Sequence, residues 1–362
     1  MNDFAYMARA IQLAKRGNFT AHPNPRVGCV IVRDQAIIAE GWHEKTGEPH
    51  AEAIALATAG DRARGATVYV TLEPCSHTGR TPPCADTLIA AGVRRVVVGM
   101  QDPNTRVAGS GLERLRNAGI EVSVGVLEPE VRKLNPGFIR RMELGLPYVR
   151  VKLAVSLDGR TAMASGESKW ITGDAARADV QKLRARSSAI VTGAGTILSD
   201  DPLLTVRTEK VARQPLRVIV DSHLSTPPDS KIFAEEGEVL VVTVSEDEEA
   251  TGALVDAGAE VIQLSSAAHG VDLLNLMQYL AERECNEVMI EAGATLAGSA
   301  VASGIVNELV IYIAPHLMGA DAKGMFNLPG VQAMQERVDL DFHDIRMVGN
   351  DLRITALVQY KD

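Results

Sequence analysis

Two short stretches of the sequence concentrate residues that could hold a metal ion. PHAE at 49–52 supplies His50 and Glu52, and TLEPCSHTGRTPPC at 71–84 supplies Cys75 and Cys84. One histidine and two cysteines provide three legs of a zinc tetrahedron, and a catalytic site leaves the fourth position to water. Zinc lowers the pKa of such a water to about 7, and the carboxylate of Glu52 is placed to carry its protons. The spacing therefore predicts hydrolytic zinc chemistry.

Two other interpretations of this cluster stay open. His77 lies between the cysteines and could close a four-ligand structural site, although such a site has no use for the Glu52 carboxylate. The second interpretation is a disulfide between the clustered cysteines, which would need an oxidising compartment. The first residues, MNDFAYMARAIQLAKRG, predict an amphipathic helix rather than a secretory signal, so we expect a cytoplasmic protein with reduced thiols.

Composition limits the partners. The formal net charge is −9 and the sequence pI is about 5.5, which gives no basic surface for nucleic acid or an anionic membrane. No apolar run reaches the roughly 18–20 residues of a membrane span. We therefore expect a small-molecule substrate, no nucleic acid and no membrane partner.

The elements expected around the cluster place its side chains at helix starts. His50 precedes a helix that runs to Gly60, Cys75 follows a strand at 67–72, and Cys84 follows Pro82-Pro83 at the start of a helix over 85–92. The positive end of a helix lowers the pKa of a thiol and favours the thiolate that zinc binds.

The whole chain alternates short apolar strands with helices, which predicts α/β layers. The alternation breaks near 135–148, where two prolines and two glycines suggest a linker or domain edge. We expect two α/β domains, at 1–145 and 146–362.

The cluster resembles that of the zinc-dependent cytidine-type deaminases, whose signature is H-x-E…P-C-x-x-C with the glutamate as general acid and base. His50-Ala51-Glu52 matches the first half, but eight residues rather than two separate Cys75 from Cys84. The chain resembles the bifunctional riboflavin-biosynthesis deaminase/reductase family in this insert, SHTGRTPP, and in HPNPRVGCVIV at 22–32. The same family resemblance continues in the later strings VKLAVSLDGRTA, SGESKWITG, DDPLLTVR and EAGATLAGS. The resemblance covers essentially the whole chain.

For the first domain the resemblance implies a cytidine-deaminase-like three-layer fold. Its substrate would be 2,5-diamino-6-(5-phosphoribosylamino)pyrimidin-4-one, deaminated to 5-amino-6-(5-phosphoribosylamino)uracil. Asn24 and Arg80 are the implied substrate contacts. Asp102 and Asn104 in QDPN are further candidates, but Asp-Pro-Asn is also a strong turn signal.

For the second domain the resemblance implies a dihydrofolate-reductase-like fold that uses NADPH to reduce the ribosyl group to a ribityl chain. VTGAGTIL at 191–198 lacks the last small residue of a dinucleotide fingerprint, because Leu198 stands there. EAGATLAGS at 291–299 is the better phosphate loop, since small residues at a helix start let backbone N–H groups approach an anion. Taken alone, this signal could equally reflect close packing.

The resemblance assigns residues of the second domain to two groups. The cofactor side comprises Ala154, Trp170, Thr196, Asp200, Ser222, Gly293, Ala294, Thr295, Leu296, Ala297, Gly298 and Ser299. The substrate side comprises Lys152, Ser168, Arg184, Leu204, Arg207 and Glu291. The two arginines are suited to the substrate phosphate, although Arg184 could be only a solvated helix residue.

The family also implies a homo-oligomer, a dimer or a tetramer. The alternative function is a zinc deaminase of another nucleobase whose second domain binds a nucleotide without reducing anything.

Overall fold

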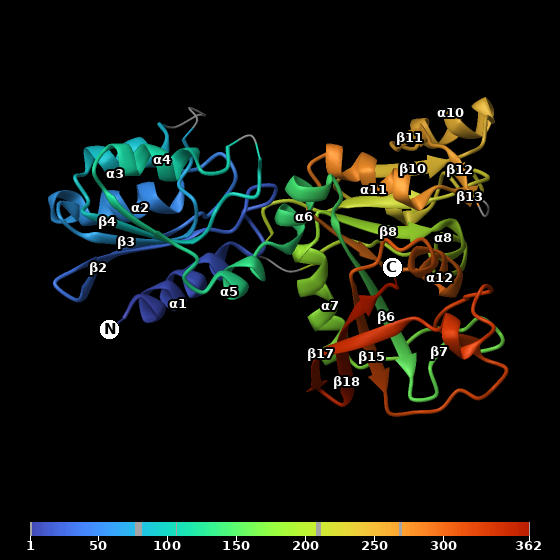
Figure 1. Cartoon of the computed structure of the whole chain (residues 1–362). Coiled ribbons are helices and arrows are strands. Elements are labelled where there is room, and N and C mark those ends of the chain that lie inside the picture. The colour runs from blue at the N-terminus through green and yellow to red at the C-terminus, as the bar shows by residue number, and fades with distance from the viewer. Residues whose placement is uncertain (1, 77–81, 106, 208–210, 268–269, 362) are drawn as a thin grey trace. The chain divides into compact units, whose positions relative to one another are not determined.

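The computed structural model describes residues 2–76, 82–105, 107–207, 211–267 and 270–361. It divides into two compact units, Met1–Gly145 and Leu146–Asp362 (Figure 1). Among the described residues, no helix combines the length and the apolar character that crossing a membrane requires.

The first unit is built on a five-stranded sheet of order β2-β1-β3-β4-β5. β1 is antiparallel to both of its neighbours, whereas β3, β4 and β5 run parallel. The strands are β1 (Gly28–Arg33), β2 (Ala36–Trp42), β3 (Thr67–Leu72), β4 (Arg95–Met100) and β5 (Glu121–Val124). Every residue of β3 is buried, as expected for a strand covered on both faces.

Helices cover both faces of this sheet and give three layers (Figure 1). Alternate residues of β1 point to opposite faces, so Cys29 and Ile31 join one core and Val30 and Val32 the other. The first core is closed by α2 (Ala51–Ala59), α3 (Cys84–Ala90) and α4 (Ser110–Asn117). The second is closed by α1 (Asp3–Ala14), α5 (Glu128–Arg132) and α6 (Pro136–Leu144).

Most of the stretch 135–148 is the helix α6, so the linker is wrong as a description of local structure. The boundary between the two compact units falls inside this stretch, after Gly145, as expected for a domain edge. Pro136 occupies the first helical turn and Gly145 ends the helix with φ 67°. Proline and glycine disrupt a helix when they lie in its interior, but proline is favoured in the first turn and glycine just after the last. Ile139 packs into the core of the first unit.

The second unit contains a nine-stranded sheet of order β11-β10-β9-β8-β14-β6-β15-β18-β17. The strands from β11 to β15 are parallel, and β18 and β17 add an antiparallel edge. Their bounds are β6 (Tyr148–Ser156), β8 (Ala189–Gly193), β9 (Leu216–Val220), β10 (Val239–Thr243), β11 (Glu260–Gln263), β14 (Glu287–Ile290), β15 (Glu308–Ala314), β17 (Asp339–Val348) and β18 (Asp351–Gln359). Two small ribbons, β7 (Arg160–Ala162) with β16 (Lys323–Gly324) and β12 (Ser266–Ala267) with β13 (Gly270–Val271), complete it.

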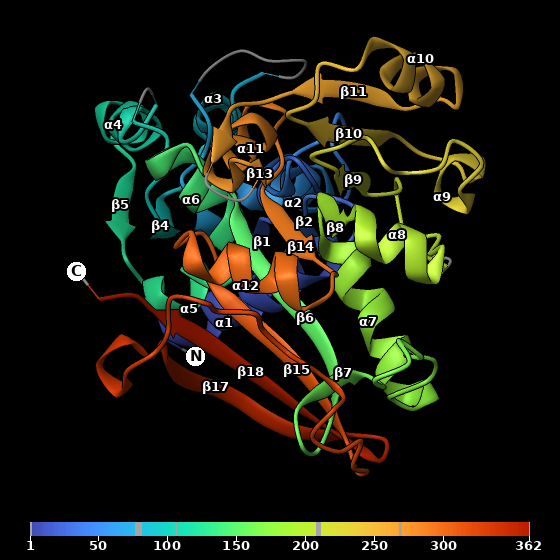
Figure 2. The same ribbon diagram turned by 90° about the vertical axis from the view of Figure 1, so that its right-hand side faces the viewer.

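Helices again cover both faces of the large sheet. α11 (Leu273–Glu282) and α12 (Ala294–Ala302) pack on one face (Figure 2). The other face carries α7 (Asp174–Arg186), α8 (Ala194–Asp200), α9 (Lys231–Ala234) and α10 (Glu248–Asp256).

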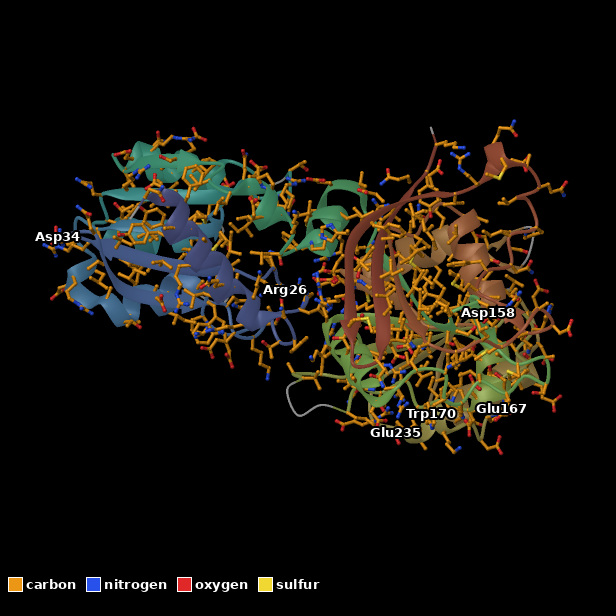
Figure 3. All side chains as sticks on the ribbon, turned by 90° about the horizontal axis from the view of Figure 1, so that it is seen from below. Arg26, Asp34, Asp158, Glu167, Trp170 and Glu235 are labelled. Carbon is orange, nitrogen blue, oxygen red and sulfur yellow. The ribbon has the colours of Figure 1, made fainter. Side chains whose placement is uncertain are left out.

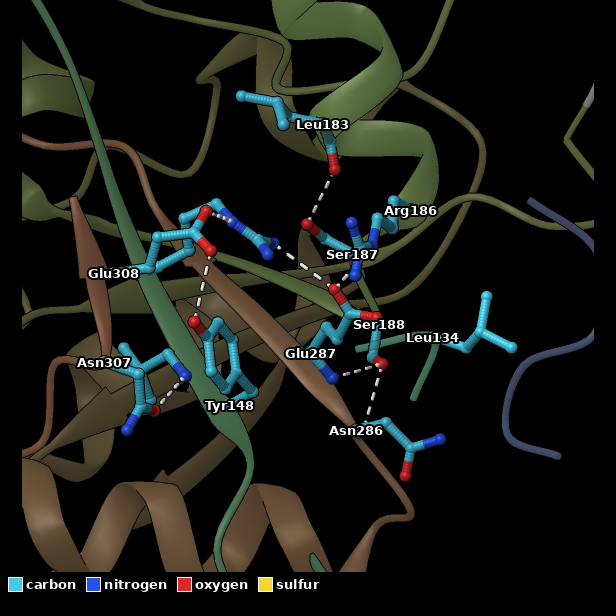
Figure 4. Close-up of polar contacts among 12 residues, drawn as sticks. Leu134, Tyr148, Leu183, Arg186, Ser187, Ser188, Asn286, Glu287, Asn307 and Glu308 are labelled. Carbon is cyan, nitrogen blue, oxygen red and sulfur yellow. Dashed lines mark hydrogen bonds and ion pairs between the residues drawn. The ribbon is translucent and has the colours of Figure 1, made fainter. Parts of the chain in front are cut away.

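Buried charges join three strands of this sheet at their amino-terminal ends (Figure 4). The Arg150 guanidinium binds Glu308 at 2.5 Å and Glu287 at 3.3 Å, and Arg186 binds Glu287 at 2.8 Å. The Tyr148 hydroxyl donates to Glu308 at 3.1 Å. Because the side chain of Arg150 is only 3% exposed, its two carboxylate partners are needed to offset the loss of hydration.

Candidate functional site

The structure of the first unit brings the three expected metal ligands together. His50 Nδ1, Cys75 Sγ and Cys84 Sγ all lie within 4.8 Å of one another. The Nδ1 atom is 3.3 Å from Cys84 Sγ and 3.6 Å from Cys75 Sγ. Ligands at about 2.1 and 2.3 Å from a tetrahedral zinc lie roughly 3.6 Å apart, so the donor set and its spacing fit zinc.

The local structure that presents these ligands is the expected one. His50 is the N-cap residue of α2, and Cys84 is the first residue of α3. Cys75 is tied to α3 because the Cys84 N–H donates to its Sγ at 3.3 Å and the Ala85 N–H to its carbonyl at 3.1 Å. Hydrogen bonding from Cys84 and His50 lowers the pKa of the Cys75 thiol to about 4, which favours a thiolate. Cys75 and Cys84 are free thiols rather than a disulfide.

Glu52 lies in the first turn of α2, beside the ligands. Only 3% of it is exposed, and burial raises the pKa of its carboxyl. Its carboxyl group also interacts with the Cys84 thiol. A buried carboxyl with a raised pKa, next to three metal-ligand atoms, is suited to taking up and releasing protons near neutral pH.

The other expected contacts of the first unit have different outcomes. Asn24 lies 3.1 Å, through Nδ2, from His43 Nε2. The Asp102 carboxylate accepts the Asn104 N–H at 2.8 Å, which is the turn interpretation of QDPN. His77 and Arg80 lie outside the described residues.

His43 is a site residue that the sequence reasoning missed. It is 2% exposed, its ring meets the His50 ring edge to face with centroids 5.4 Å apart, and its Nδ1 lies 3.3 Å from the Pro49 carbonyl. Burial lowers its pKa. The sequence did offer a signal for His43, because it stands directly after the strand β2 and seven residues before His50.

The second unit holds a cavity of about 1380 Å³ where the parallel strands β6, β8, β9 and β14 end. Carboxyl ends of parallel strands are where α/β proteins bind ligands. Most of the expected cofactor and substrate residues line it, namely Lys152, Ala154, Ser168, Trp170, Arg184, Thr196, Asp200, Leu204, Arg207, Ser222, Glu291, Gly293, Thr295, Leu296 and Ser299.

Three residues of the expected phosphate loop do not line the cavity. Ala297 is fully buried in the core, and a Cβ on Gly298 would lie 2.0 Å from the Asn327 carbonyl oxygen. Ala294 is the first residue of α12 and is also absent from the wall. The small residues of this stretch therefore serve two needs, the helix start at Gly293 and close packing behind it.

A charged cluster occupies the wall between α7 and β14. Arg184 binds both oxygens of Glu291 at 2.8 Å and donates to the Thr205 carbonyl at 3.1 Å. Burial alone would raise the pKa of the Glu291 carboxyl, but the Arg184 guanidinium and Lys152 hold this pKa at about 2. Burial lowers the pKa of Lys152. Arg184 is thus committed to Glu291, and Arg207 is the exposed arginine of the wall.

A second part of the wall joins the segment before α7 to the C-terminal end of α8. Ser168 Oγ donates to Asp200 at 3.1 Å. Trp170, which Figure 3 labels, is 72% exposed. The Arg177 guanidinium lies 4.7 Å from the centre of the Trp170 ring. Leu204 is buried with φ 53°, a backbone conformation that a bulky residue adopts only when its surroundings impose it. Arg177 also lines the cavity and was not expected from the sequence.

Comparisons with known proteins agree with both halves of this description. Residues 1–100 match the cytidine and deoxycytidylate deaminase zinc-binding region, and residues 147–354 match the RibD C-terminal domain. The chain is 50% identical over 364 residues to riboflavin biosynthesis protein RibD of Escherichia coli (strain K12), covering 97% of this chain and 98% of the relative.

Solved structures of full length are also similar. RibD of Acinetobacter baumannii superimposes with a TM-score of 0.92 at 45% identity, covering 99% of both chains. A diaminohydroxyphosphoribosylaminopyrimidine deaminase/5-amino-6-(5-phosphoribosylamino)uracil reductase from Thermotoga maritima gives 0.87 at 35% identity, also with 99% of both chains covered. The expected fold, a cytidine-deaminase-like domain followed by a dihydrofolate-reductase-like domain, is confirmed. The chain belongs to the RibD family, the bifunctional zinc deaminases and NADPH-dependent reductases of riboflavin biosynthesis.

Proposed function

We propose that His50, Cys75 and Cys84 hold the zinc of the deaminase and that Glu52 is its acid and base. The convergence of the three ligand atoms beside a buried carboxyl carries this proposal. Zinc, when bound, supplies an acidified water as the nucleophile. Glu52 takes up a proton and delivers it to the exocyclic nitrogen of the pyrimidine, which leaves as ammonia. Asn24 and Arg80 contact the substrate, the diaminopyrimidinone with its phosphoribosylamino group.

The cavity of the second unit binds NADPH and the deaminated substrate in this proposal. Gly293 and the start of α12 bind a cofactor phosphate through backbone N–H groups. Arg207, which is exposed, meets the substrate phosphate. Lys152 and Glu291 lie together in the wall and supply polar partners for the ribosyl group that is reduced. NADPH, when bound, supplies the hydride.

The metal assignment is tested by zinc content and ammonia release. We expect His50→Ala to lose both, and Glu52→Gln to keep stoichiometric zinc while losing ammonia release. Glutamine nearly keeps the shape of glutamate but cannot exchange the proton. Zinc that stays bound in His50→Ala, or that disappears in His77→Ala together with the fold, would indicate a structural site instead.

We also propose that the protein is a cytoplasmic homo-oligomer that binds no nucleic acid. The edge strand β17 exposes Phe342 and Met347, each 62%, and Ile345, 52%. Exposed apolar side chains on an edge strand form a surface that a second copy of the chain would cover. Sedimentation of wild type beside Phe342→Glu tests this, and a wild-type monomer at micromolar concentration would contradict it.

A further inference from the structure

The glutamate of the TLEPC stretch has a role that the deaminase chemistry above does not use. Glu73 follows β3 directly and is 6% exposed. Its main-chain N–H donates to the Met100 carbonyl at 3.0 Å, so its backbone prolongs the pairing of β3 with β4. The side chain is therefore fixed at its base, two residues before the metal ligand Cys75.

Four backbone N–H groups converge on the Glu73 carboxylate. Oε2 accepts from Asp102 at 3.1 Å and from Gly109 at 3.0 Å. Oε1 accepts from Gly111 at 2.9 Å and from Leu112 at 3.4 Å. Gly109 and the two following donors form the N-terminus of α4. One buried carboxylate thus binds the start of α4 and the turn after β4 with both oxygens.

The same helix start is packed directly against the segment that carries Cys75. A Cβ on Gly111 would lie 2.0 Å from the Pro74 carbonyl oxygen, so only glycine allows this approach. Ser110 Oγ lies 2.6 Å from Ser76 Oγ. The residues on either side of Cys75 therefore both touch the first turn of α4.

α4 also holds the helix that carries Cys84. Arg114 Nη1 donates to the Ser76 carbonyl at 3.1 Å and to both oxygens of Asp86, at 3.0 and 2.9 Å. Asp86 lies in the first turn of α3, which begins at Cys84. α4 thus contacts the segment of Cys75 through its first turn and the helix of Cys84 through Arg114.

We propose that Glu73 is a positioning residue of the deaminase, which anchors α4 and thereby fixes the separation of the two cysteine ligands. It does not touch the substrate or the metal. The proposal rests on the proposed function, because it supposes that His50, Cys75 and Cys84 hold zinc. Partners that orient metal ligands in this way typically contribute a factor of about 10 to 100 to metal affinity.

Glu73→Gln is the direct test. Glutamine presents one acceptor oxygen and an NH₂ group, which cannot satisfy the two N–H donors that face the second oxygen. Glu40→Gln is the matched control, because Glu40 also uses both oxygens, at 2.7 and 2.9 Å to Arg9, in the same unit. We would measure zinc affinity by competition with a chromogenic chelator, ammonia release, and NADPH oxidation with the deaminated substrate.

The expected result for Glu73→Gln is zinc affinity about 10- to 100-fold weaker, slower ammonia release and an unchanged reductase rate, with wild-type zinc affinity in Glu40→Gln. Wild-type zinc affinity in a folded Glu73→Gln overturns the proposal, even if its unfolding temperature falls. If Glu73→Gln does not fold, Arg114→Met is the second test, because the Arg114 side chain is 44% exposed and the core does not need it. Weaker zinc binding by Arg114→Met supports the proposal, and unchanged zinc binding overturns it. Zinc that survives His50→Ala would overturn the proposed metal site and this inference together.

Discussion

The ion pair between Arg184 and Glu291 makes a quantitative prediction about the second unit. In Glu291→Gln the carboxylate charge is lost while the volume is kept. Arg184, 12% exposed, and Lys152 are then left in the cavity wall without their negative partner. We expect the second unit to lose about 3 kcal/mol of stability at pH 7, because removing one partner of a buried pair typically costs about 3–5 kcal/mol.

The pKa of Glu291 gives the same magnitude independently. A carboxyl that titrates near 2 in the folded unit and near 4.5 in the unfolded chain stabilises the fold by about 3 kcal/mol above pH 4.5. Because the folded pKa is the lower one, this contribution is present above the unfolded pKa and is lost as pH falls toward 2. Between pH 7 and pH 4 wild type should lose about 1 kcal/mol from this group, and Glu291→Gln should not.

The assay is urea unfolding read by hydrogen exchange of the β6 and β14 peptides, at pH 7 and pH 4. Asp339→Asn is the control, because its ion pair with Arg337 is about half exposed and such pairs contribute at most about 1 kcal/mol. The reasoning is refuted if Glu291→Gln loses no more stability than the control, or if its difference from wild type is the same at both pH values.

Three further predictions follow from separate parts of the structure. Arg150→Met should destabilise the second unit by about 3 kcal/mol in the same unfolding assay, because it leaves the buried carboxylates of Glu287 and Glu308 without their partner. NADPH affinity should not change, since these carboxylates lie at the strand ends opposite the cavity, and a weaker affinity would show that the two ends are coupled. Removing zinc with a chelator should abolish ammonia release and leave NADPH oxidation with the deaminated substrate intact, whereas a parallel loss of both rates would contradict separate sites. Trp170→Ala should raise the NADPH dissociation constant, measured by fluorescence titration, by about tenfold for the loss of one stacked ring; an unchanged constant would place the cofactor elsewhere.

The convergence of His50, Cys75 and Cys84 was predictable because its determinants are local. Pro82-Pro83 fix the start of α3 at Cys84, and His50 stands where the apolar pattern of α2 begins. Ligands at helix starts depend on capping chemistry that a few neighbouring residues decide. The α/β layers, likewise, follow from the alternation of strands and helices along the chain.

The residues that were missed depend on contacts between distant segments. His43 matters only because folding places it against His50, and Glu73 only because α4 begins beside it. Ala297 and Gly298 were expected at the cofactor, but a run of small residues serves close packing as well as anion binding. Sequence periodicity does not distinguish these two uses, since both require the absence of large side chains.

The central claim is that one chain deaminates a pyrimidine at Glu52 and then reduces the product in its second unit. It is tested most directly by supplying the diaminopyrimidine phosphoribosylamine as the sole substrate and following ammonia and NADPH together, in wild type and in Glu52→Gln. Wild type should release ammonia and oxidise NADPH. Glu52→Gln should do neither, and should oxidise NADPH at the wild-type rate when given the deaminated compound. NADPH oxidation by Glu52→Gln with the undeaminated substrate would contradict the order, and ammonia release without NADPH oxidation in wild type would contradict the reductase assignment.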